Sequence, residues 1–179
     1  IGLFENRSHI QPSAVFGNPA AHGQALKNQT DDLGIYVADV FLQCDLEFAP
    51  KAVNHPDPRI RASVRDDFRR LLEYACAAGS KHVTGLPGVV FDQYENDFSL
   101  ACEELSWRAG QARAAGLTFG IEPHLGSIAD TPAKALRLVR ETEGLTLTLD
   151  YTHFTKIGIP DDQIEPLIAH ASHFHARGA

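Results

Sequence analysis

Hydrophobic and polar positions along the chain follow two alternating periods. After Asp57-Pro58, which resembles the start of a helix, apolar side chains recur at helical spacing as far as Ala75. In LTFGIEPH, beginning at Leu117, apolar and polar residues alternate as they do along a strand. We expect helices at 21–33, at 95–115, at 161–169 and after Pro58 and Pro132, and strands at 1–4, 35–42, 81–86, 117–123, 145–150 and 171–176.

A glycine joins an expected helix to the following strand at four places. These residues are Gly34, Gly79, Gly116 and Gly144. Glycine commonly ends a helix because it adopts the left-handed backbone conformation without strain. Repeated alternation of helix and strand predicts a parallel sheet.

Two α/β architectures fit six strands in 179 residues. A doubly wound sheet could be complete at this size, whereas a (β/α)8 barrel needs roughly 250 residues. Because the chain both starts and ends with an expected strand, a barrel cut at both ends is a serious option. We find no linker and expect a single domain over residues 1–179.

The composition argues against several classes of protein, among them nucleic-acid-binding, disulfide-rich and membrane-spanning proteins. The chain is 44% hydrophobic and 22% charged, and its net charge of -7 argues against a broad basic surface for nucleic acid. Cys44, Cys76 and Cys102 are widely spaced, so we expect neither a disulfide framework nor a thiolate zinc site, and the cytoplasm fits best. No apolar run is long enough to span a membrane. The absence of methionine indicates that this is not a whole reading frame as translated.

Ionisable residues stand at the ends of three successive expected strands. They are Glu122, Asp150 and His175. Carboxyl ends of parallel strands lie together, and β/α folds place their sites there. Two carboxylates and an imidazole suit one divalent ion such as Mn²⁺, Mg²⁺, Co²⁺ or Zn²⁺. His153, three residues after Asp150, could contact the substrate or support a ligand.

The segments IEPHLGS, LDYTHF and HFHARGA, in this order and spacing, resemble the xylose isomerase-like TIM barrel superfamily, the sugar phosphate isomerase/epimerase group. The resemblance runs from the second strand of that barrel to the seventh, so the first and eighth strands are absent. It implies that Glu122, Asp150 and His175 ligate one catalytic metal and that His153 faces the substrate. The family's fourth ligand, a Glu on the eighth strand, is missing, and we expect this chain alone to be inactive.

The function implied by the resemblance is a metal-dependent isomerase or epimerase of a small sugar, polyol or hydroxy-carbonyl compound. A base removes the proton next to a carbonyl, and the metal stabilises the resulting enediolate. Glu122 and His153 are the expected catalytic residues, with Glu122 as the base. The expected substrate-binding residues are His153, Arg177, His124, Glu5 and His9.

Three other functions stay open. A dehydratase would use the same chemistry. A hydrolase similar to the apurinic endonucleases would need histidines after the third and fourth strands of the barrel, where Gln43 and Leu86-Pro87 stand. A non-catalytic fragment is the third. We expect a small sugar-like partner and neither nucleic acid nor membrane, and we leave homo-oligomerisation open.

Overall fold

A parallel sheet forms the centre of the computed structural model, which describes residues 1–5 and 8–176. Its six strands are hydrogen-bonded in chain order, and every pair is parallel. They are β1 (Gly2–Phe4), β2 (Val40–Gln43), β3 (His82–Gly85), β4 (Thr118–Ile121), β5 (Thr146–Leu149) and β6 (Ala171–Phe174). Because the order never reverses, the sheet has no switch point. The doubly wound alternative is therefore wrong, and the strands form an incomplete barrel.

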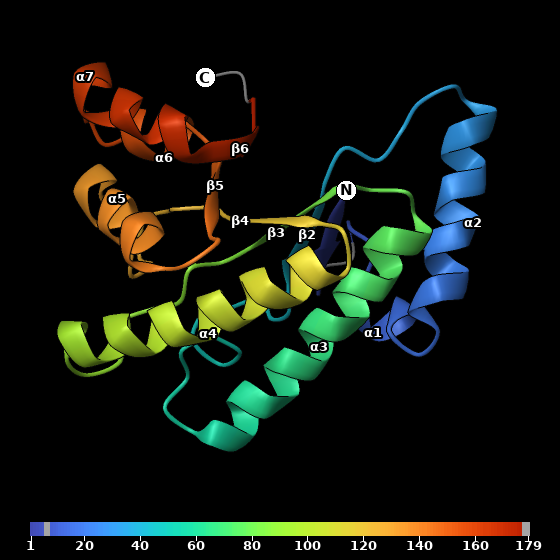
Figure 1. Ribbon diagram of the computed structural model, residues 1–179, viewed down its shortest axis with the longest axis horizontal. Coiled ribbons are helices and arrows are strands. Elements are labelled where there is room, and N and C mark those ends of the chain that lie inside the picture. The colour runs from blue at the N-terminus through green and yellow to red at the C-terminus, as the bar shows by residue number, and fades with distance from the viewer. Residues whose placement is uncertain (6–7, 177–179) are drawn as a thin grey trace.

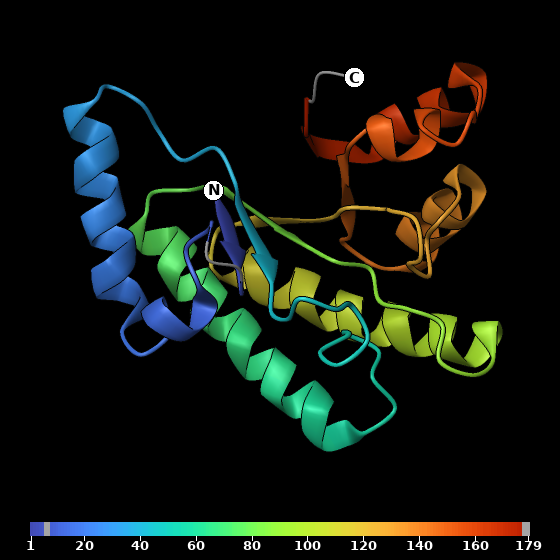
Figure 2. The same ribbon diagram turned by 180° about the vertical axis from the view of Figure 1, so that it is seen from behind.

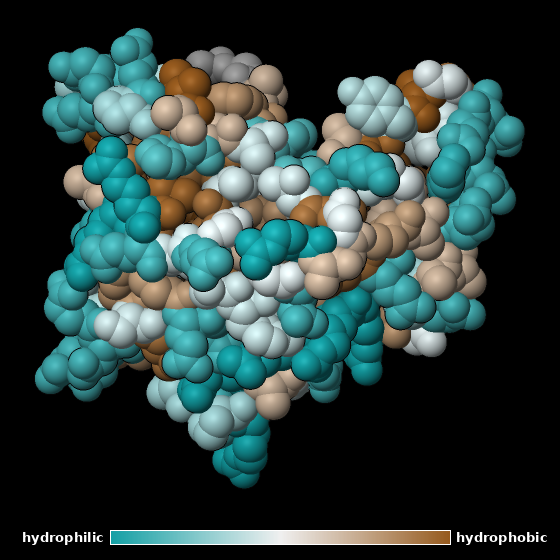
Figure 3. Space-filling view, viewed as in Figure 1, coloured by the Kyte–Doolittle hydropathy of each residue, from teal (hydrophilic) through white to brown (hydrophobic). Residues whose placement is uncertain are grey.

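The helices connect successive strands. They are α1 (Pro12–Val15), α2 (Pro19–Asp32), α3 (Pro58–Ala77), α4 (Tyr94–Ala114), α5 (Pro132–Glu141), α6 (Thr152–Thr155) and α7 (Asp161–Ile164), followed by a 3₁₀ helix at Glu165–His170. In Figures 1 and 2, α2, α3 and α4 follow one another around the outside of the sheet. Figure 3 shows a mostly hydrophilic surface over α3. Among the described residues, no helix combines the length and apolarity needed to cross a bilayer.

Local sequence signals set the ends of these helices. Asp57 and Thr131 accept hydrogen bonds from the first-turn N–H groups of α3 and α5, and a proline follows each of them. The four predicted helix-ending glycines have positive φ angles: Gly34 (66°), Gly79 (77°), Gly116 (74°) and Gly144 (74°). The expected glycine caps are confirmed.

The two faces of the sheet differ in polarity, as the alternation predicts. Leu147 and Leu149 are buried in the hydrophobic core together with Phe68 and Leu71 of α3. On the other face, the hydroxyl oxygens of Thr84 and Thr148 lie 2.7 Å apart although β4 separates their strands. The alternation of apolar and polar residues therefore separates the two faces, and the polar face continues towards the carboxyl ends of the strands.

Two predicted elements differ in the structure. The strand expected at 35–42 begins only at Val40. Ile35 and Tyr36 are 55% and 84% exposed, and the Ile35 N–H donates to Thr30 at the end of α2. The helix expected at 161–169 becomes a 3₁₀ helix from Glu165, next to Pro166, which lacks the N–H that an α-helix needs.

Gly120 is the residue that lets Thr84 and Thr148 meet across β4. A Cβ atom at this position would lie 2.7 Å from the Thr148 hydroxyl and 3.1 Å from the Thr148 backbone nitrogen. At Gly110 in α4, by contrast, a Cβ atom would meet nothing within 4 Å.

We therefore expect Gly120→Ala to lower the free energy of unfolding by about 1–3 kcal/mol through overpacking. Gly110→Ala, the matched control, should raise it by about 0.5–1 kcal/mol, because alanine has the higher helix propensity. Urea unfolding of both variants measures the difference. Equal effects of the two substitutions would contradict the close approach of β3, β4 and β5.

Candidate metal centre

Glu122 directly follows β4 and is only 4% exposed. Its N–H donates to the Gly85 carbonyl at 3.0 Å, which continues the pairing with β3 beyond the end of the strand. Burial acts to raise the pKa of Glu122, but the imidazoles of His153 and His175 beside the carboxylate outweigh it and lower the pKa to about 2. The carboxylate is therefore ionised at neutral pH.

Asp150 directly follows β5 and is completely buried. Its Oδ1 accepts hydrogen bonds from the N–H of Thr152 at 2.9 Å and from its hydroxyl at 2.6 Å, which fixes the turn into α6. That turn brings His153 back towards both carboxylates. Its Nε2 lies 3.5 Å from Glu122 Oε2 and 3.7 Å from Asp150 Oδ2.

His175 follows β6, and its N–H donates to the Leu149 carbonyl at 3.1 Å. Its Nδ1 donates to Glu122 Oε1 at 2.5 Å. The ring stacks on Phe41, with a centroid distance of 5.7 Å. The nearby carboxylates of Asp39 and Glu122 raise the pKa of His175 to about 9 despite its burial.

These side chains suit a divalent cation. Donor atoms of Glu122, Asp150 and His153 all lie within 4.8 Å of one another. His153 Nε2 is buried and makes no hydrogen bond, which leaves an imidazole nitrogen directed at two carboxylates. The structure thus joins His153 to the predicted pair Glu122 and Asp150, while His175 contacts Glu122 from the other side.

A cavity of about 280 Å³ opens beside this group. Glu122, His153 and His124 contribute its ionisable lining, and its other lining residues are Phe4, Phe41, Gln43, Phe48, Leu86 and Leu125. The Nδ1 of His124 lies 2.8 Å from the Leu125 carbonyl, which fixes the ring. Burial lowers the pKa of His124, so its imidazole is neutral near pH 7. His124 thus lines the cavity beside Glu122, and substrate contact by its ring stays a prediction.

The remaining predicted substrate-binding residues lie in different places. Glu5 accepts hydrogen bonds from the N–H and hydroxyl of Ser13 and lines a separate cavity, so the structure does not join it to Glu122. His9 is exposed and packs edge-on against Phe4, 4.6 Å between ring centroids. Arg177 lies outside the described residues. Substrate contacts by all three stay predictions.

Asp39 is a residue of this region that the sequence reasoning missed. It stands just before β2 and is 5% exposed. His82 Nδ1 donates to its Oδ1 at 2.7 Å, and the Thr84 hydroxyl donates to the same oxygen at 2.9 Å. His82 is itself buried, with 6% of its surface exposed. A carboxylate inside the apolar segment VADVF was the signal that could have identified Asp39.

Comparison with known protein families identifies the family to which the chain belongs. A family model described as xylose isomerase-like TIM barrel matches residues 4–179. The chain belongs to this family. No curated protein sequence matches it.

Solved structures with this fold include three enzymes of 14–18% sequence identity to the chain. D-psicose 3-epimerase from Clostridium cellulolyticum H10 has a TM-score of 0.76 at 18% identity, over 92% of this chain and 60% of that one. The E. coli 3-keto-D-glucoside 4-epimerase has a TM-score of 0.73 at 14% identity, over 88% and 64%. A probable 3-DHS dehydratase from Bacillus anthracis has a TM-score of 0.70 at 15% identity, over 92% and 58%. The chain spans less than two thirds of the length of each of these three proteins. At sequence identities this low, the similarity shows the fold alone.

The contacts of His175 predict a raised pKa for its imidazole in the metal-free protein. Because the folded-state pKa of about 9 exceeds the ordinary value of 6.5, its contribution to stability is complete below about pH 6.5. That contribution is lost as the pH rises through 9. NMR titration of the ring should show the raised pKa, and Glu122→Gln should lower it. Glu95→Gln, which changes a carboxylate paired with Arg137 on the surface, should leave it unchanged. A wild-type value near 6.5 would contradict the contacts described.

Proposed function

We propose that this chain carries the metal centre of a divalent-metal-dependent isomerase or epimerase acting on a small sugar, polyol or hydroxy-carbonyl compound. The observation that supports it most is the convergence of two carboxylates and two imidazoles at the ends of β4, β5 and β6, beside a cavity. The proposal treats residues 1–179 as one partial barrel domain.

Glu122, Asp150 and His175 would hold the cation, for which Mn²⁺, Mg²⁺, Co²⁺ and Zn²⁺ are all chemically suited. When bound, the cation supplies positive charge that stabilises an oxyanion developing next to the reacting carbon. His153 is the proposed substrate-facing histidine, because its buried Nε2 makes no hydrogen bond within the protein and can bond to a substrate oxygen.

Glu122 is the proposed base. It is ionised at neutral pH, so it can remove the proton from the carbon next to a carbonyl. In an isomerase the same carboxyl returns that proton to the neighbouring carbon. In an epimerase Glu122 keeps the proton that it removed, and a second acid on the opposite face of the substrate donates another proton to the same carbon. The apolar walls formed by Phe41, Phe48 and Leu86 pack against carbon atoms of the substrate and exclude water.

The dehydratase among the solved structures supports a second candidate reaction. Loss of water from a β-hydroxy carbonyl compound begins with the same proton removal by Glu122. The β-hydroxyl then leaves and takes up a proton, so one water is released and a carbon–carbon double bond forms. Release of water from the substrate, detected by mass spectrometry as the loss of 18 mass units, distinguishes it from isomerisation.

The residues at the ends of β2 and β3 argue against the endonuclease alternative. Gln43 ends β2, and Leu86 directly follows β3, and both line the cavity at the places where that reading needs histidines. An isomerase or epimerase with a single cation remains the proposal that these residues support.

Metal binding by the chain provides one test. Asp150→Asn replaces a buried carboxylate by a neutral amide and should weaken Mn²⁺ binding by at least about tenfold, since even residues that only support ligands cost about 10–100-fold. Asp130→Asn, which changes a partly exposed carboxylate paired with Lys134, is the control and should leave the affinity unchanged. Calorimetric titration with MnCl₂ measures both. Equal affinities for wild type and Asp150→Asn would contradict the assignment of Asp150.

Proton exchange provides the second test, in a protein that combines these residues with a complete eight-stranded barrel. Glu122→Gln should lower turnover by about 10²–10⁴, as for the loss of a positioned general base. In D₂O the wild type should place deuterium on the carbon next to the carbonyl, and the variant should not. Exchange at the wild-type rate in Glu122→Gln would show that another residue is the base.

A further inference from the structure

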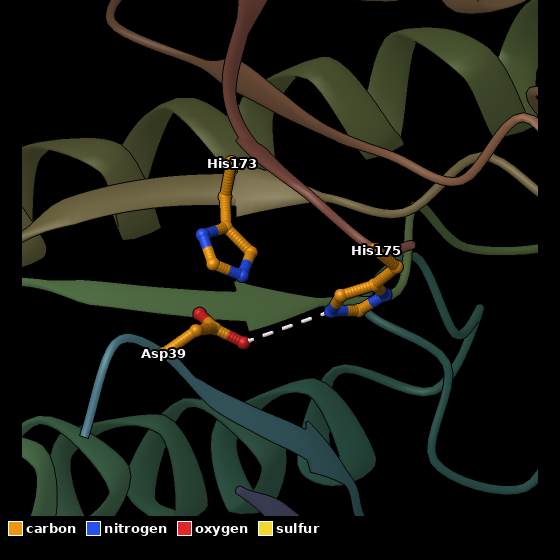
Figure 4. Close-up of side chains that lie close together, drawn as sticks. All are labelled: Asp39, His173 and His175. Atoms are coloured by element: carbon orange, nitrogen blue, oxygen red, sulfur yellow. Dashed lines mark ion pairs between the residues drawn. The ribbon is translucent and has the colours of Figure 1, made fainter. Parts of the chain in front are cut away.

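Two carboxylates flank the ring of His175, one at each nitrogen. Glu122 Oε1 lies 2.5 Å from Nδ1, and Asp39 Oδ2 lies 3.9 Å from Nε2. Figure 4 shows one ring nitrogen facing Asp39 while the other points away from it. Glu122 comes from the carboxyl end of β4, whereas Asp39 stands at the amino end of β2, so the two reach the ring from opposite ends of the sheet.

Asp39 is held in a fixed orientation. Its Oδ1 accepts from His82 Nδ1 and from the Thr84 hydroxyl, both on β3. The Nε2 of His82 in turn lies 2.7 Å from the Ser172 hydroxyl on β6. Rotation of the carboxylate away from His175 would break these buried hydrogen bonds, so Oδ2 stays directed at Nε2.

A histidine that ligates a metal does so through the lone pair of one nitrogen, and the hydrogen bond of its other nitrogen decides which one that is. Cation binding at Nδ1 requires the Nδ1 proton, which now bonds to Glu122, to leave for solvent. The remaining proton then sits on Nε2, where Asp39 is the adjacent acceptor.

We propose that Asp39 is a positioning residue that holds the Nε2–H of His175 and thereby makes Nδ1 the nitrogen that ligates the cation together with Glu122. The inference rests on the proposed function, because it requires the metal centre. It adds to that centre a carboxylate that touches neither substrate nor metal.

The same geometry allows one alternative, a cation between Asp39, His173 and His175, whose donor atoms lie within 4.8 Å of one another. Two observations disfavour it. His175 makes its short contact through Nδ1 to Glu122, and the ring of His173 stacks on His82 with centroids 5.1 Å apart. The two sites differ in the nitrogen of His175 that binds the cation.

The test is a calorimetric titration of the chain with MnCl₂, comparing wild type with Asp39→Asn and Thr84→Val. Asp39→Asn keeps the shape but removes the charge that Nε2–H needs, and should weaken binding about 10–100-fold. Thr84→Val is the matched control, because it removes one hydrogen bond to Asp39 while the bond from His82 Nδ1 still holds the charged carboxylate facing His175. It should change the affinity by less than about threefold, and far-UV circular dichroism checks that both variants fold.

A second measurement reads the ring directly and needs no variant. In wild type loaded with Zn²⁺, a diamagnetic probe, ¹⁵N NMR of His175 should show a metal-bound Nδ1 and a protonated Nε2. A metal-bound Nε2 would overturn the proposal in favour of the alternative site.

The titration has three further outcomes that count against the inference. Equal affinities for wild type and Asp39→Asn would overturn it while leaving the metal centre intact. Equal losses in Asp39→Asn and Thr84→Val would also overturn it, because the hydrogen-bond network and not the charge would then be responsible. A wild-type chain that binds neither Mn²⁺ nor Zn²⁺ would refute the metal centre itself and this inference with it.

Discussion

Parallel pairing of the strands in chain order is the constraint on which the rest of the structure depends. It aligns the carboxyl ends of β4, β5 and β6, so residues that directly follow these strands meet although 53 positions separate Glu122 from His175. The alternation of side chains then assigns the leucines of β5 to the helices and Thr148 to the opposite face. A shift of one residue would exchange those faces and disperse the site.

The buried polar groups on that face form hydrogen bonds with one another. Asp39, His82, Thr84 and Thr148 are each less than 10% exposed, and hydrogen bonds connect them across β2, β3 and β5. The network is possible because Gly120 leaves room above β4. Since an unpaired buried carboxylate is costly, the pairing of Asp39 with His82 and Thr84 contributes to stability as well as to its orientation towards His175.

Much of the fold could be predicted from local chemistry. Proline after a capping residue marked α3 and α5, and glycine marked four helix ends, because both devices act within a few residues. The apolar pair Ile35 and Tyr36 was misleading: both side chains are exposed, and only tertiary packing decides whether an apolar run is a buried strand. The short helix α6 was missed because Asp150 initiates it with hydrogen bonds that also position His153.

The candidate site was predictable in part. Glu122, Asp150 and His175 stood out because each follows a recognisable strand. The structure brings Glu122 and Asp150 together with His153, and His175 contacts Glu122; that the predicted three share a metal stays a prediction. Asp39 was not found for two reasons. It precedes its strand, whereas the other candidates follow theirs, and the residue that it faces, His175, is distant from it in the sequence. Contacts between residues so far apart depend on sheet order, which a single sequence indicates only through its alternation of elements.

The central claim is that Glu122, Asp150 and His175 share one divalent cation. The most direct measurement is the anomalous scattering of Mn²⁺ in crystals of this chain grown with MnCl₂. The account predicts a single peak at the ends of β4, β5 and β6, at ligand distances of about 2.0–2.3 Å from these three side chains. A peak between Asp39 and His173, or no peak at saturating Mn²⁺, would contradict it.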